Sequence, residues 1–141
     1  RFRELVLQDE DEPIFRPPPP MERPRPIAHL TWHRLQGHYG PSLMDVLAAG
    51  PLEPVPGTSY LWAELDWSAQ QESVVHLDDL LLRRTRLGLI LPDGARALLP
   101  ALRRRLSADL DWSDADWQAE IERYLHLWRA SYYLPGEQQT A

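Results

Sequence analysis

Apolar residues recur at spacings of three and four after Ile27, and this is the period of an α-helix. The first three predicted helices run from about Leu30 to His38, from Pro41 to just before Gly50, and from about Ser59 to Glu72. Proline suits a first helical turn and glycine suits a helix end, which supports these boundaries. The third segment is apolar on two sides, so we expect it to be a central helix.

Helical patterns continue through the second half of the chain. A fourth helix is predicted over about Leu77–Leu87, with Gly88 as its C-terminal stop. Pro100 either kinks the next helix or begins a separate one that ends near Leu110. Ser113 has the spacing of a capping box for the last helix. The apolar side of that helix consists of Trp117, Ile121, Tyr124, Leu125, Trp128 and Tyr132.

No alternating pattern of useful length predicts a strand, and no internal repeat is visible. We therefore expect an all-α fold, a compact bundle of about five to seven helices. Residues 1–26 differ from this pattern, because they contain the acidic run Asp9–Glu12 and half of the fourteen prolines. Prolines favour extended backbone. The expected organisation is an extended linker (1–26), an α-helical C-terminal domain (27–136) and a loose tail (137–141).

Composition narrows the classes of function. The 141 residues include no cysteine, and all fifteen basic residues are arginine. Disulfides, cysteine-ligated metals, a Schiff-base lysine and a phosphate-loop lysine are thereby excluded. A net charge of −6 argues against nucleic acid as a partner. No apolar run approaches the length of a transmembrane helix, and we expect a cytoplasmic protein.

One charged side chain does not follow the separation of apolar and polar sides on the predicted fourth helix. Arg84 projects into its leucine face on a helical wheel, and a buried guanidinium requires an acceptor. Glu64 lies between the two apolar sectors of the third helix, so we predict a partly or fully buried Glu64–Arg84 ion pair. The alternative is that Arg84 extends to the edge of the fold and Glu64 faces water. Asp79 and Arg83 are spaced to pair at i,i+4.

The sequence contains no convincing active site. His29 and His33 share a helical face but lack a third ligand for zinc. Arg103–Arg105 wrap around a helix and do not line one side of it. We expect these arginines to face solvent; the alternative is that they contact a phosphate or an acidic partner. No serine or threonine has a histidine–carboxylate arrangement, and no glycine-rich nucleotide fingerprint occurs. We predict no catalytic, cofactor-binding or metal-binding residue.

The string from Tyr60 to Gly88, YLWAELDWSAQQESVVHLDDLLLRRTRLG, resembles the C-terminal helical domain of the FAD-dependent glycerol-3-phosphate dehydrogenases and glycerophosphate oxidases. That family carries an Ala-Glu-Leu helix followed by Asp-Asp-x-Leu-x-Arg-Arg-Thr-x-x-Gly. The step Arg34-Leu35-Gln36-Gly37-His38-Tyr39-Gly40 is similar to the family's Arg-Leu-x-x-x-Tyr-Gly. The likeness extends over about residues 30–134 and includes Leu110-Asp111-Trp112-Ser113 before the aromatic helix.

The resemblance implies a parent protein with an N-terminal flavin domain, and the first residue, Arg1, fits a chain cut from a longer one. The parent would oxidise glycerol 3-phosphate, or another polyol phosphate, to dihydroxyacetone phosphate or its counterpart, with FAD as cofactor. The fragment itself would be structural and inactive, packed on the flavin domain of the same chain. Homo-oligomerisation and peripheral association of the parent with the inner face of the membrane stay open. The alternative is a stand-alone helical module that binds a protein through its arginine patches or its proline-rich arm.

Overall fold

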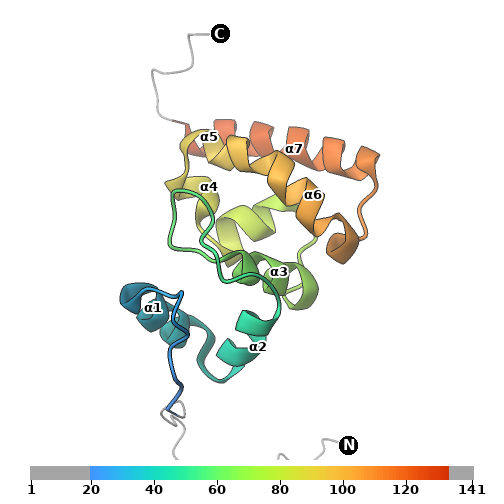
Figure 1. Ribbon diagram of the computed structural model, residues 1–141. Helices are drawn as coiled ribbons and strands as arrows, with labels where there is room; N and C mark the ends of the chain where they lie inside the picture. The colour runs from blue at the N-terminus through green and yellow to red at the C-terminus, as the bar shows by residue number, and fades with distance from the viewer. Residues whose placement is uncertain (1–19, 134–141) are drawn as a thin grey trace, which may run out of the picture.

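The computed structural model describes residues 20–133, and its secondary structure is helical (Figure 1). Its elements are α1 (His29–Tyr39), the 3₁₀ turn η1 (Gly40–Ser42), α2 (Leu43–Ala48), α3 (Trp62–Gln71), the π-helix η2 (Asp79–Arg84), α4 (Leu87–Ile90), α5 (Pro92–Ala95), the 3₁₀ turn η3 (Arg96–Leu98), α6 (Leu99–Leu110) and α7 (Asp114–Tyr132). Within the described range the only β feature is an isolated bridge between Pro54 and Leu61. The predicted all-α class is confirmed.

The predicted ends of the domain fall largely beyond the described residues. Residues 1–19 and 134–141 lie outside that range, so the extended linker over 1–26 and the loose tail over 137–141 stay predictions. Ile27 is the first deeply buried residue of the described part. It packs with Trp32 and Leu35 of α1, and this contact begins the first hydrophobic cluster.

The core consists of two hydrophobic clusters that meet at α3. The smaller cluster joins α1 and α2 to Leu61 and Ala63. The larger cluster packs Leu65 of α3 against η2, α4, α6 and α7. In Figure 1, α1 and α2 lie at one end of the domain and α6 and α7 at the other, with α3 between them. The prediction that the third helix is central is therefore confirmed.

The prediction of one regular α-helix over Leu77–Leu87 is wrong. Asp79–Arg84 form a π-helix, and the N–H of Thr85 donates to the carbonyl of Leu80 at 3.0 Å, five residues back. The Thr85 hydroxyl donates to the same carbonyl at 2.7 Å. Thr85 has extended backbone (φ −116°, ψ 176°), so the chain leaves the helix there and re-enters α4 at Leu87.

Gly88 does not end a helix, as the sequence had suggested, but lies buried inside α4. A Cβ at this position would come within 2.3 Å of the Tyr124 hydroxyl oxygen. The Gly88 carbonyl accepts a hydrogen bond from the Trp128 indole N–H at 2.7 Å, and the Gly94 carbonyl accepts one from the Tyr124 hydroxyl at 2.8 Å. Glycine at position 88 therefore allows α7 to approach the α4 backbone closely.

The start of α7 follows the predicted capping box. The Asp116 N–H donates to the Ser113 hydroxyl at 3.2 Å, and the Asp116 carboxylate accepts from the Ser113 N–H at 2.9 Å. Pro100 lies in the first turn of α6, so of the two predicted outcomes it begins a separate helix and does not kink a longer one. Asp93 does not cap a helix through its side chain; it has a left-handed backbone conformation with φ +50°.

Candidate functional site

The Glu64 carboxylate is fully buried and accepts four hydrogen bonds from described residues. Arg34 of α1 donates to both carboxylate oxygens at 2.7 Å. The Tyr39 hydroxyl donates at 3.1 Å, and the Leu61 N–H at the start of α3 donates at 2.7 Å. Glu64 therefore joins α1 to α3 and also caps its own helix.

The predicted partner of Glu64 was wrong. Glu64 is buried as expected, but Arg84 is exposed and forms no ion pair with any residue between 20 and 133. The cause is the π-helical turn, because an i→i+5 turn rotates successive side chains differently from an α-helix and the helix ends at Thr85. Arg34 takes the place that Arg84 was expected to fill.

Contact with Glu64 keeps the side chains of Arg34 and Tyr39 each in one ionisation state. Burial lowers the pKa of Arg34, but its hydrogen bonds to Glu64 and the charge of Glu64 raise the pKa more, so the net change is upward. Burial and the adjacent Glu64 carboxylate raise the pKa of Tyr39 far above its ordinary value. Tyr39 is therefore a neutral donor and Arg34 a cation near neutral pH, and neither side chain can accept a substrate proton there.

The two aspartates of the family-like string have structural partners. Asp78 is nearly buried and accepts from Arg123 of α7 and from Arg83, the latter at 3.1 Å. Asp79 forms the predicted i,i+4 ion pair with Arg83. Asp79 also accepts from the His76 N–H at 2.9 Å and so caps the turn that precedes η2. Asp78 therefore ties the start of η2 to α7, whereas Asp79 makes contacts only within its own segment.

Glu120 completes the contact between α7 and that segment. Its carboxylate accepts from the Leu77 N–H at 3.1 Å, from Arg123 at 3.1 Å, and faces the His76 ring nitrogen at 2.9 Å. Partial burial raises the pKa of Glu120, but these hydrogen bonds and the charge of Arg123 lower the pKa further than burial raises it. Glu120 is thus held as a carboxylate in a structural role.

A second buried carboxylate fixes α6 to α3. Asp66 is 3% exposed and accepts two hydrogen bonds from Arg105, one of them at 2.7 Å from Nε. The hydrogen bond to Asp66 raises the pKa of Arg105. The Asp66 carboxylate lies against Gly50, where a Cβ would meet it at 1.8 Å. Of the three consecutive arginines, Arg105 is therefore structural and not part of a free patch.

The histidine pair does not form a metal centre. His29 and His33 lie edge to face with ring centroids 4.5 Å apart on the exposed side of α1. Within residues 20–133, no group of three or more histidine, aspartate or glutamate side chains is placed to hold a metal ion.

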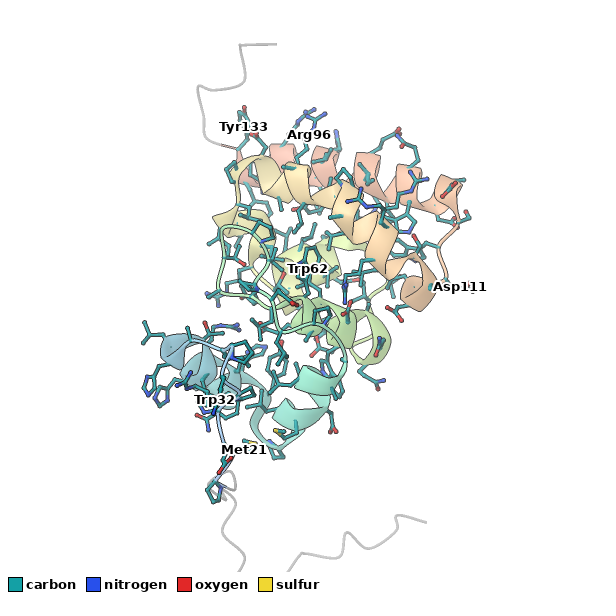
Figure 2. All side chains as sticks on the ribbon, viewed as in Figure 1. Met21, Trp32, Trp62, Arg96, Asp111 and Tyr133 are labelled. Atoms are coloured by element: carbon teal, nitrogen blue, oxygen red, sulfur yellow. The ribbon has the colours of Figure 1, made fainter. Side chains whose placement is uncertain are left out.

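A groove with a volume of about 380 Å³ lies between η3–α6 and α7 in the described part of the chain. Its floor includes Leu99, Ile121 and Leu125, and Arg96 and Arg104 lie at its edge. A smaller hollow of about 180 Å³ adjoins it and shares Arg96 and Leu125. Figure 2 shows Arg96 near Tyr133 at the end of the domain away from Met21. Sequence reasoning missed Arg96, because a lone arginine in a turn gives no periodic signal.

Comparison with known proteins places this architecture in a family. A sequence model of the C-terminal domain of alpha-glycerophosphate oxidase matches residues 22–117, which is more than half of the chain. The chain belongs to this family. The matched range includes Arg34, Glu64 and the segment from Asp78 to Gly88.

Curated relatives of this C-terminal domain include glycerol-3-phosphate dehydrogenase 2 of Mycobacterium bovis and of Mycobacterium tuberculosis. Each is 29% identical over 99 residues, an alignment that covers 64% of this chain and 17% of the relative. The chain therefore matches about a sixth of the length of these relatives. No solved structure matches the chain significantly.

The described residues of the C-terminal domain do not fit the FAD that the resemblance implies for the parent. Dinucleotide sites of the common type use a strand, a glycine-rich turn and a helix N-terminus that faces the pyrophosphate. Residues 20–133 contain no strand, and the positive-φ glycines Gly40, Gly57 and Gly94 are isolated from one another. In the same range no helix combines the length and the apolar character that a bilayer crossing requires.

Proposed function

We propose that this chain is the C-terminal accessory domain of an FAD-dependent glycerol-3-phosphate dehydrogenase, and that its own role is structural. The family match supports the first part. The second part rests on one observation: the buried carboxylates Glu64, Asp66 and Asp78 all bind arginines of the same domain. Removing one partner of such a pair destabilises the fold, and none of these three carboxylates is free to act as an acid or base in catalysis.

In the parent protein, the oxidation takes place outside residues 20–133. The secondary alcohol of glycerol 3-phosphate loses a hydride and a proton to give the ketone of dihydroxyacetone phosphate. FAD supplies the acceptor for the hydride when it is bound to the preceding domain. The accessory domain contributes a folded surface on which that preceding domain rests.

The test compares this chain with the complete gene product. We expect the complete protein to be yellow and to reduce an artificial electron acceptor when glycerol 3-phosphate is added. This chain alone should be colourless and inactive in the same assay. A complete protein that binds flavin but oxidises no polyol phosphate would refute the proposed reaction, and activity of this chain alone would refute the structural role.

The alternative proposal is a stand-alone interaction module, which the exposed arginines beside the groove favour. The two proposals differ in what precedes Arg1 in the gene. An in-frame strand, Gly-x-Gly-x-x-Gly turn and helix supports the dehydrogenase. A start codon immediately before Arg1 supports the module.

A further inference from the structure

The groove between η3–α6 and α7 is bordered by arginines that differ from the three that bind buried carboxylates. Arg34, Arg105 and Arg123 each bind a buried carboxylate. Arg96 and Arg104 are exposed and form no ion pair within residues 20–133. Clustered cations without counter-charges repel one another and attract anions. The electrostatic character of this face is thus set by cations that the described fold leaves without a partner.

Two further arginines extend the positive edge. Arg129 lines the adjoining hollow, is exposed, and likewise has no carboxylate partner in the described range. Arg103 contacts Asp114 at 2.7 Å, but Asp114 is 92% exposed, so this ion pair is solvated and weak. Asp93 is the one carboxylate that lines either hollow. The edge therefore carries four arginines against one acidic side chain.

The floor of the groove is apolar and only partly covered. Ile121 and Leu125 belong to the side of α7 whose sequence pattern is apolar, and their neighbours Trp117 and Tyr124 are fully buried. Ile121 and Leu125 keep intermediate exposure, because α6 does not close over them. A ligand that fits this groove must therefore supply apolar side chains as well as negative charge.

We propose that the groove binds an acidic peptide segment with flanking apolar residues, supplied by the part of the parent protein that lies outside this chain and precedes it. This inference rests on the proposed function and names the surface through which the accessory domain contacts the rest of its chain. Charge complementarity selects an acidic occupant, and the apolar floor between two helices selects a peptide over a free phosphate. The curated relatives contain about five-sixths of their length outside the matched region, which provides the partner.

Arginine-selective labelling by phenylglyoxal, followed by mass spectrometry, tests the contact directly. We expect Arg96, Arg104 and Arg129 to react at least about tenfold more slowly in the complete parent protein than in this chain. Arg84 and Arg86 are also exposed and serve as internal controls whose rates should change less than about twofold. Equal rates for the groove arginines in both proteins, or slowing confined to the two controls, would overturn the proposal.

A second arm tests the chemistry of the occupant. The probe is the synthetic peptide ELVLQDEDEPIF, which is residues 4–15 of this chain and carries Asp9–Glu12 between apolar residues. Added to the full chain, it should slow labelling of Arg96, Arg104 and Arg129, whereas the amide analogue ELVLQNQNQPIF should not. Equal effects of the two peptides, or no effect of either, would contradict an acidic occupant. Protection in this chain alone that rises with its concentration would assign the groove to a second copy.

Charge reversal completes the design. Arg96→Glu with Arg104→Glu should abolish the slowing of Arg129 labelling by the acidic peptide, because Arg129 is the labelled groove arginine that this variant keeps. Arg84→Glu with Arg86→Glu, which has the same change in charge, is the matched control and should keep that slowing. None of these four arginine side chains forms a hydrogen bond within the described fold, so both variants should fold. Oxidation of glycerol 3-phosphate is measured on the same parent sample. If the parent protein oxidises glycerol 3-phosphate but its groove arginines are labelled as fast as those of this chain, only this inference is refuted. If the unlabelled, flavin-loaded parent does not oxidise glycerol 3-phosphate, the proposed function is refuted.

Discussion

Replacing Glu64 by alanine tests the buried ion pair. The carboxylate accepts four hydrogen bonds, two from Arg34 and one each from Tyr39 and the Leu61 N–H. A hydrogen bond to a charged group contributes about 1.5–3 kcal/mol, but the four losses do not add. The Arg34 side chain keeps 29% exposure, so water can partly hydrate it after the carboxylate is removed. The expected loss in the free energy of unfolding is therefore about 3–5 kcal/mol, the usual cost of removing one partner of a buried pair.

The assay is urea unfolding followed by far-ultraviolet circular dichroism. With a slope of about 2 kcal/mol per molar urea, a loss of this size lowers the midpoint by roughly 2 M. Glu122→Ala is the matched control, because Glu122 is exposed and, among the described residues, its side chain accepts a hydrogen bond only from Gln118. Glu122→Ala and Arg84→Ala should each change stability by no more than about 0.5 kcal/mol. Equal losses for Glu64→Ala and Glu122→Ala would refute the reasoning.

Three further predictions concern α7 and the glycines. Gly88→Ala should destabilise the domain by about 1–3 kcal/mol in thermal unfolding, because the added Cβ overpacks against Tyr124. Gly37→Ala should stabilise the domain by up to about 1 kcal/mol, because a Cβ added at this position of α1 meets open space. A less stable Gly37→Ala than Gly88→Ala would contradict the packing around these two glycines. Tyr124→Phe should cost about 1 kcal/mol by leaving the buried Gly94 carbonyl without its donor, and an unchanged melting temperature would argue against that hydrogen bond. Because the folded protein lowers the pKa of Glu120, its stabilising effect is complete above its unfolded pKa of about 4.3 and is lost as the pH falls through the lowered folded value. The stability difference between the wild type and Glu120→Gln should thus be largest near neutral pH and shrink below about pH 4, and a difference independent of pH would contradict this.

Helical periodicity was sufficient to predict the fold class and the central position of α3. It was also sufficient to predict that Glu64 is buried, because the residues around it are apolar on two sides. It was insufficient to identify the partner of Glu64, because a wheel of 100° per residue assumes a regular α-helix over the segment that contains Arg84. The hydrogen bonds from Thr85 to Leu80 make that turn π-helical and end it. Such a change depends on tertiary packing and leaves no periodic signal.

The true partners did leave a weak signal. Arg34 lies two residues after Trp32 and directly before Leu35, both buried, so its side chain emerges at the border of the apolar face of α1. Arg34 and Tyr39 both occur in the Arg-Leu-x-x-x-Tyr-Gly step by which the chain resembles its family. Reading that step as a source of donors for a buried acid would have identified the pair. The groove, in contrast, depends on how α6 and α7 are spaced, which residue type and period do not specify.

The division of the core at α3 has a consequence for how the domain opens. The cluster of α1 and α2 is small and is held to α3 mainly by Leu61, Ala63 and the Arg34–Glu64 pair. Regions with few apolar contacts open below the global unfolding energy, as separate cooperative units. Amide protons of α1 and α2 should therefore exchange with solvent deuterium in a sub-global event while α3, α6 and α7 stay protected. Weakening of the Arg34–Glu64 contact would then release the N-terminal helices first, and the remaining bundle would persist as a native-like intermediate.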